Sequence, residues 1–161
     1  MRTTIFGSIL LIALVTGCRT IARTPVDQTL DRFHAAAARA DEKIYFDCFA
    51  PEGVFLGTDA TERWDVPSFR AFAHPYFSQG KGWTYTSSDR HIAMAPSNDL
   101  AWFDEMLQND KLGTCRGSGV LRLINGEWKI AQYNLSIPIP NDHAKTVVEM
   151  IRTAAATQKT K

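Results

Sequence analysis

The sequence lacks an excess of charge of either sign: 18 Lys and Arg stand against 17 Asp and Glu, and no basic stripe runs along the chain. This balance argues against nucleic acid as a partner. The four histidines are scattered without the paired spacing of metal ligands, so the sequence predicts no metal site and no cofactor. Gly117-Ser118-Gly119 lacks the spacing of a nucleophile elbow, and no glycine-rich loop of the phosphate-binding kind is present.

No apolar run reaches the roughly 20 residues that a membrane-spanning helix needs. The uncharged segment 5–15 follows Arg2 and has the length of a signal-peptide core. It leads into Val15-Thr16-Gly17-Cys18, which resembles the bacterial lipobox. The resemblance implies cleavage after Gly17 and acylation of Cys18, so that lipid anchors the protein to a membrane of the cell envelope. Arg19, where some lipoproteins carry Asp, favours the outer membrane facing the periplasm if the source is Gram-negative. The alternative is a plain secretory signal with an incidental cysteine.

Cysteine is sparse, with three residues in the whole chain. If lipid occupies Cys18, only Cys48 and Cys115 remain, and they would lie in an oxidising compartment. They either form a disulfide or remain as two separate buried thiols. We divide the chain into a signal peptide (1–17), a tether (18–23), one globular domain (24–140), and a C-terminal helix and tail (141–161).

Apolar residues recur at helical spacing in four segments. Thr24 caps the first predicted helix, and Asp41 caps the second, which Pro51-Glu52-Gly53 ends. Pro67 opens the third helix, and the last helix follows Asn141. The remaining patterned segments predict strands at 54–56, 61–64, 83–94, 100–108, 113–124 and 127–137. Helices followed by a long antiparallel meander predict an α+β fold, with a curved sheet wrapped on the N-terminal helices around a cone-shaped hollow.

Five segments carry a family resemblance: Leu30–Ala37, Phe49–Trp64, Ala101–Glu105, Cys115–Leu121 and Ile130–Asp142. Together they resemble the SnoaL-like branch of the nuclear transport factor 2-like (NTF2-like) superfamily. The resemblance covers nearly the whole domain and implies the cone-shaped fold. It says little about activity, because this fold hosts isomerases, cyclases, dehydratases and pure binding modules.

A hairpin turn at Asn125-Gly126 allows the faces of the sheet to be assigned. Counting back from it pairs Gly119 with Gln132 and Gly117 with Asn134, and opposed residues share a face. Apolar residues nearer the turn predict that this face points inward, with ligand space beside the glycines. Relatives often carry His where this chain has Gln132 and Asn134, which weakens the case for imidazole acid–base chemistry at these positions.

The preceding hairpin extends this pairing to a carboxylate. With a four-residue loop, Asp104 lies opposite Gly117 and Trp102 opposite Gly119, so these residues converge with the two amides. If the length of this loop differs by one residue, Glu105 points inward in place of Asp104. A bulge at Gly117 or Gly119 would also shift the register.

Each candidate has two interpretations. A carboxylate in an apolar cone can act as a general base with a raised pKa, as it does in ketosteroid isomerase. Asp104 can equally be a structural acid paired with Arg116 or Arg63. Gln132 and Asn134 either orient a ligand or satisfy buried backbone groups.

Three functions follow. The first is a lipid-anchored binding module for a small, mostly apolar molecule, without chemistry. Its expected ligand-binding residues are Tyr45, Trp102, Gly117, Gly119, Gln132 and Asn134. The second is an isomerase, cyclase or dehydratase with Asp104 as the catalytic base. The third is an envelope interaction protein that forms a homodimer through the outer sheet face, where Tyr133, Leu135 and Ile137 would need to be covered.

Overall fold

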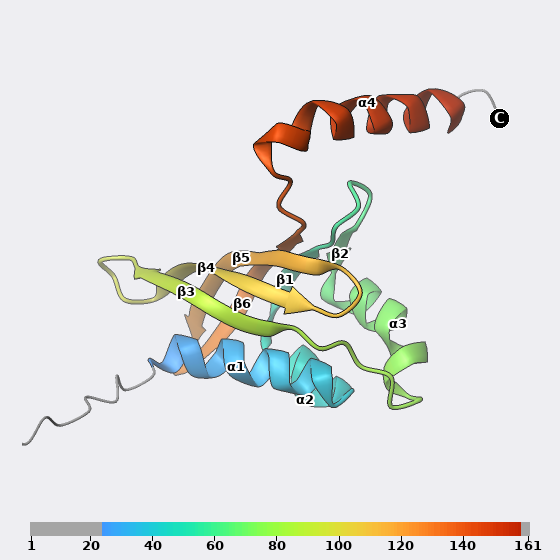
Figure 1. Ribbon diagram of the computed structural model, residues 1–161. Coiled ribbons are helices and arrows are strands. Elements are labelled where there is room, and N and C mark those ends of the chain that lie inside the picture. Colours follow the sequence, from blue (N-terminus) through green and yellow to red (C-terminus); the bar gives the residue numbers. More distant parts are fainter. Residues whose placement is uncertain (1–23, 159–161) are drawn as a thin grey trace, which may run out of the picture.

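The computed structural model describes residues 24–158, so the expected signal peptide, Cys18 and the tether lie outside the described residues. The elements are α1 (Pro25–Ala38), α2 (Glu42–Asp47), β1 (Phe49–Leu56), β2 (Arg63–Asp65), α3 (Val66–Phe77), β3 (Thr86–Met94), β4 (Leu100–Asn109), β5 (Gly113–Ile124), β6 (Glu127–Ser136) and α4 (Asn141–Gln158). This order confirms the α+β prediction. Figure 1 shows a curved sheet with α1, α2 and α3 beneath it and α4 above it.

Local sequence signals place the helix starts. Thr24 and Asp27 form a reciprocal capping box at the start of α1. The Asp41 and Asp65 side chains each accept a backbone N–H at the starts of α2 and α3. Pro51 was expected to help end the second helix, but α2 already ends at Asp47 and β1 runs through Pro51. The strand tolerates this proline because its pairing with β6 is irregular between Phe49 and Val54.

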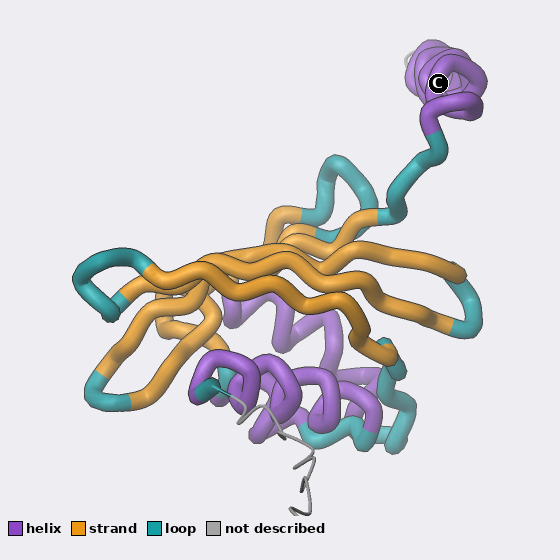
Figure 2. Tube along the Cα trace, turned by 60° about the vertical axis from the view of Figure 1, so that its left-hand side comes forward, coloured by secondary structure: helices purple, strands orange, loops and turns teal. Residues whose placement is uncertain are grey.

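The six strands form one sheet in the order β2-β1-β6-β5-β4-β3. Every neighbouring pair is antiparallel except β1 and β6, which are parallel. Helices α1, α2 and α3 cover one face, and α4 stands apart beyond the other (Figures 1 and 2). We call the helix-covered side the inner face and the opposite side the outer face. No helix in the described range is both long and apolar enough to cross a membrane.

The β5–β6 hairpin begins as the sequence predicts and then changes register. Asn125 and Gly126 have φ angles of 51° and 82°, which fits the expected two-residue turn. Leu121 pairs with Ile130, but the next pair is Val120 with Gln132, so β6 contains an extra residue at this point. This β-bulge reverses the side on which every later β6 residue points.

The β4–β5 hairpin has a three-residue loop, not the predicted four-residue loop. Asn109 pairs with Gly113, whose φ of +71° is the left-handed conformation typical of such loops. Glu105 therefore lies opposite Gly117, which is the register the one-residue alternative predicted.

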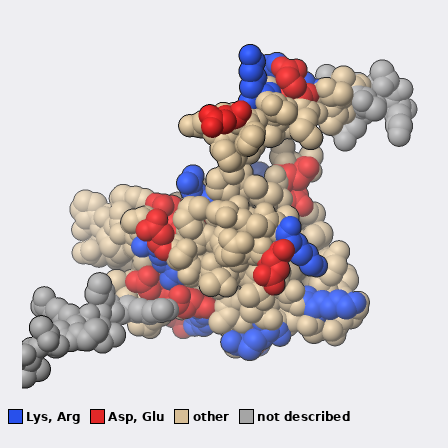
Figure 3. Space-filling view, viewed as in Figure 1, with Lys and Arg blue, Asp and Glu red and all other residues tan. Residues whose placement is uncertain are grey.

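The inner face and its helices enclose an aromatic core. Phe33 stacks on Tyr45, and Phe55 stacks on Phe69. Cys48 and Cys115 are both fully buried and both free, so the disulfide alternative is wrong in this structure. On the surface seen in Figure 3, basic and acidic side chains are interspersed, on the body and on α4 alike.

Candidate functional site

A cavity of about 210 Å³ lies where the inner face of the sheet meets α1, α2 and α3. Its wall is made almost wholly of aromatic and aliphatic side chains. They are Phe33, Ala37, Tyr45, Phe55, Phe69, Phe72, Trp83, Tyr85, Tyr133 and Leu135, together with His34. Phe72 is 43% exposed, so its ring lies at the mouth of the cavity. The chain thus builds an apolar, concave site of the kind that holds small molecules.

His34 is the only imidazole in this wall, and α1 places it there. It lies one turn after Leu30, on the helix face that packs against the sheet, and its side chain is buried. Its Nε2 lies 2.6 Å from Oε1 of Glu105, which β4 projects from the inner face. Glu105 has no solvent exposure. A buried carboxylate therefore holds the ring in one orientation at the edge of the cavity.

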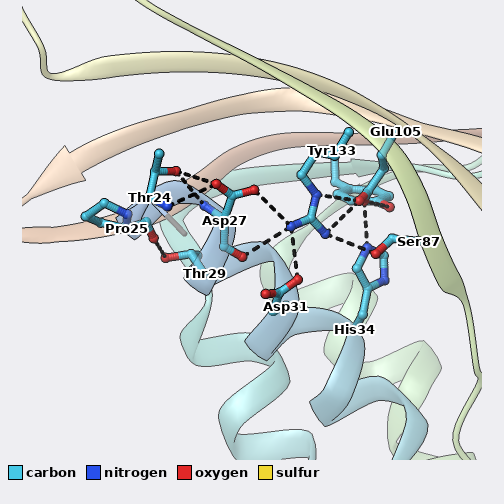
Figure 4. Close-up of polar contacts among 10 residues, drawn as sticks. Thr24, Pro25, Asp27, Thr29, Asp31, His34, Ser87, Glu105 and Tyr133 are labelled. Carbon is cyan, nitrogen blue, oxygen red and sulfur yellow. Dashed lines mark hydrogen bonds and ion pairs between the residues drawn. The ribbon is translucent and has the colours of Figure 1, made fainter. Parts of the chain in front are cut away.

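Arg90 of β3 compensates the buried charge of Glu105. Its Nε donates to Oε2 of Glu105 at 2.8 Å, and another guanidinium nitrogen donates to Asp31 at 3.0 Å. The same guanidinium contacts the backbone carbonyl and carboxylate of Asp27 and the hydroxyl of Ser87. Arg90 thus links the α1 acids to Glu105. Figure 4 shows Asp27 and Asp31 on one side of this network, with Glu105 and His34 on the other.

These contacts decide the protonation state of Glu105. Burial raises the pKa of its carboxyl group. The hydrogen bonds and charges of His34 and Arg90 together lower this pKa by more than burial raises it, so the net pKa lies below its ordinary value. The ionised carboxylate can only accept hydrogen bonds, so Nε2 of His34 must carry a proton and donate it. The remaining ring nitrogen, Nδ1, is then the acceptor in a neutral imidazole. Within residues 24–158, Nδ1 has no hydrogen-bond partner. Every fully buried side-chain nitrogen or oxygen in this range does have a partner. Nδ1 is therefore not fully buried, and its surface is accessible to a small molecule.

Three tyrosines add hydroxyl groups to the wall. Burial is the main cause that raises the pKa of Tyr45 and Tyr133 well above 10, and burial raises the pKa of Tyr85 to about 12. All three stay protonated at neutral pH. The Tyr133 hydroxyl donates to Oε1 of Glu105 at 3.3 Å, which adds a third side chain to the support of that carboxylate.

Four of the predicted site residues lie on the outer face, away from this cavity. Trp102, Gln132 and Asp104 are exposed and Asn134 is half-buried. The structure does bring them together, because Trp102 and Gln132 flank Val120 in one row of the sheet, while Asp104 and Asn134 flank Ser118 in the next. The prediction that they converge inside the cone is wrong, since it assumed an unbroken hairpin register and a longer β4–β5 loop. The bulge also turns Tyr133 and Leu135 inward, where the prediction placed them outside.

The two predicted glycines do not leave open space. A Cβ on Gly119 would collide with the backbone carbonyl of Gln132, and one on Gly117 would collide with the Tyr133 hydroxyl. Gly119 thus permits the bulge, and Gly117 admits the tyrosine that reaches Glu105. The prediction of ligand room beside these glycines is wrong.

Tyr45 lines the cavity as expected, and the alternative carboxylate Glu105 lies beside it. Sequence analysis did not single out His34 or Arg90. A signal for His34 existed, because it falls on the apolar stripe of α1 beside Leu30 and Phe33. Arg90 had no such signal, because its partners lie 59 and 15 residues away. Within the described part of the chain, no cluster of three metal-ligating side chains occurs.

Comparisons with known proteins identify the fold. The sequence profile of the SnoaL-like domain matches residues 26–140. A Pseudomonas putida protein of unknown function described as NTF2-like has a TM-score of 0.61 and 14% identity, over 72% of this chain and 86% of that chain. A candidate dehydratase of the NTF2-like family from Streptomyces avermitilis has a TM-score of 0.60 and 12% identity, over 72% and 95%. A candidate ketosteroid isomerase from Shewanella frigidimarina has a TM-score of 0.54 and 18% identity, over 70% and 95%. A search of curated proteins gives no match.

Proposed function

Because the chain belongs to the SnoaL-like domain family, we propose that its domain binds a small, mostly apolar molecule in the aromatic cavity. The observation that carries this proposal is the cavity of about 210 Å³ with a wall of rings and one imidazole. An apolar cavity of about 150 Å³ holds benzene, so this one suits a ligand of one or two fused rings. Flat rings also match the stacked and edge-on faces that aromatic side chains present.

The cavity carboxylate favours binding over carboxylate base catalysis. A carboxylate that serves as a general base near neutral pH needs a raised pKa and a free oxygen. Glu105 has the opposite properties, because its pKa is lowered and His34, Arg90 and Tyr133 occupy its oxygens. Asp104, the base expected from the sequence, projects from the outer face. These contacts support a binding role in which Glu105 is structural.

Naphthalene titrated into the chain from residue 24 onward tests the proposal, with binding followed by calorimetry and tryptophan fluorescence. Ala37 lines the cavity, whereas its neighbour Ala38 is exposed, so the two positions offer a matched pair. Ala37→Leu should fill the space and abolish binding, and Ala38→Leu should leave it unchanged. Thermal unfolding of both variants checks that they fold. If naphthalene does not bind the unmodified domain, or if both variants bind it equally, the proposal fails.

We further propose that this domain is held at the cell envelope by lipid on Cys18, on the outer membrane if the source is Gram-negative. The supporting feature is the Val15-Thr16-Gly17-Cys18 segment after a short uncharged run. A cavity domain beginning at residue 24 would then lie within a few residues of the membrane surface.

The outer face supports a second proposal, that two copies of the domain pair through it. Trp102 is 49% exposed there, on β4, and it neighbours Val120 on β5. A large exposed aromatic ring is typical of protein interfaces. Sedimentation equilibrium of the domain should give a dimer mass that falls to the monomer mass in Trp102→Lys. Met94→Lys, which changes another exposed apolar residue on the edge strand β3, is the control. A monomer at every concentration would contradict this proposal.

A further inference from the structure

We propose that the ligand of this cavity is a hydroxyaromatic molecule, and that Nδ1 of His34 accepts the proton of its hydroxyl group. This inference rests on the proposed binding function and adds the chemical class of the ligand and the group that selects it. The two claims separate, because an apolar cavity binds plain hydrocarbons whether or not His34 takes part.

The first step is the fixed tautomer of His34. The Glu105 carboxylate lies 2.6 Å from Nε2 and cannot donate, so the Nε2 proton points at Glu105. In the neutral ring, Nδ1 then presents a lone pair. Besides the three tyrosine hydroxyls, the wall is hydrocarbon, and Nδ1 is its one group that can accept but not donate. This pattern fits a hydrocarbon ligand with one donor, such as a phenol.

The second step is the charge around the ring. Two α1 carboxylates and Glu105 surround one guanidinium, that of Arg90. Their formal charges leave this cluster negative when His34 is neutral. A positive charge on His34 is stabilised by the Glu105 carboxylate in direct contact with it. The cluster thus stabilises the imidazolium that forms when a ligand transfers its proton to Nδ1.

The third step is the proton transfer itself. The hydroxyl O–H bond breaks, its electron pair stays on the ligand oxygen, and a new N–H bond forms at Nδ1. The products are a phenolate and an imidazolium, so charge and atoms balance without any other reactant. For weakly acidic hydroxyls the same geometry gives a hydrogen bond to Nδ1 without transfer.

Other titratable groups face this part of the cavity from each element. Asp31 lies on α1, Tyr45 on α2, Tyr85 just before β3, Arg90 on β3, Glu105 on β4, Cys115 on β5 and Tyr133 on β6. The tyrosines and the cysteine have raised pKa values and stay neutral at neutral pH. Glu105 stays ionised, because its pKa is lowered. The basic nitrogen that this wall offers to a ligand is therefore Nδ1 of His34.

4-Nitrophenol is the test probe, because only its phenolate is yellow. In a cavity without a base, burial disfavours the phenolate and moves the colour transition to higher pH. Proton transfer to His34 should instead move it to lower pH on binding to the unmodified domain. His34→Gln keeps a polar side chain but has no basic nitrogen, so its transition should move to higher pH. His74→Gln, at an exposed histidine on α3, should behave like the unmodified domain.

Glu105 is a positioning residue in this scheme, and Glu105→Gln tests it. Loss of the carboxylate should move the transition of the bound dye toward higher pH, whereas a purely structural role would change only the melting temperature. If a variant does not fold, the direction of the shift in the unmodified domain still decides the question.

A matched ligand pair gives an independent measure. 2-Naphthol and 2-methylnaphthalene have nearly the same shape, and one acceptor for the hydroxyl should make the naphthol bind roughly threefold to tenfold tighter. If naphthalene binds but the naphthol is not preferred and the dye transition rises, the inference is overturned and the binding function stands. If none of these probes binds, both are overturned.

Discussion

Replacing Arg90 by leucine removes the main countercharge of a fully buried carboxylate. The Arg90 side chain is 10% exposed and that of Glu105 is 0% exposed, and their atoms approach to 2.7 Å. Loss of one partner of a buried ion pair costs about 3–5 kcal/mol, because the remaining charge stays buried without its countercharge. Domains of ordinary stability have about 5–15 kcal/mol in total. At about 4 °C per kcal/mol for a domain of this size, we expect Arg90→Leu to lower the melting temperature by roughly 12–20 °C.

Arg122→Leu is the matched control, since it makes the same substitution at an exposed pair. Arg122 contacts Glu52 on the surface, and both side chains are about half exposed. Exposed pairs contribute at most about 1 kcal/mol, so this variant should melt within a few degrees of the unmodified domain. Calorimetric melting at neutral pH measures both. Equal shifts in the two variants would refute the assignment of Arg90 as the countercharge of Glu105.

The effect of Arg90→Leu should also depend on pH. The pKa of Glu105 is lowered in the folded state, so its ionisation stabilises the fold above its ordinary pKa of 4.5, and this stabilisation is lost as pH falls through the lowered value. Protonated Glu105 no longer needs a guanidinium. The melting difference between the unmodified domain and Arg90→Leu should therefore shrink as pH falls below about 4.5. A difference that is constant with pH would mean that Arg90 acts by packing alone.

Three further predictions concern single positions. Gly119→Ala should lower the free energy of unfolding by about 1–3 kcal/mol or more, because the added Cβ meets neighbouring backbone. Gly80→Ala has open space around its Cβ and should lower it by only about 1 kcal/mol, because of the positive φ at this position; urea unfolding compares the two variants. Cys48 and Cys115 should both be alkylated in denaturant without reductant, and neither should react quickly in the native domain, because burial raises the pKa of both thiols; intact mass reports the count. Cys18→Ser should lose its lipid and leave the membrane fraction, and a variant that stays there at unchanged mass would disprove the anchor.

Local signals in the sequence determined the elements and the fold family. Thr24 with Asp27, Asp41 and Asn125-Gly126 act through neighbours two to four residues away, so their caps and turn follow from the sequence alone. The alternation of apolar residues likewise set the strands. These signals are enough for the α+β order, which residues 26–140 share with the SnoaL-like domain.

The tertiary structure alone decided which side chains enter the cavity. Whether β6 contains a bulge depends on its fit to β5, where Gly119 admits the carbonyl of Gln132. One extra residue exchanged the two faces of β6, so Gln132 and Asn134 point outward and Tyr133 inward. The polar site shows the same limit, because Arg90 meets its carboxylates only through long-range packing of β3 and β4 on α1. Periodicity assigns a residue to a strand, but a side chain's face depends on the register of its partner strand.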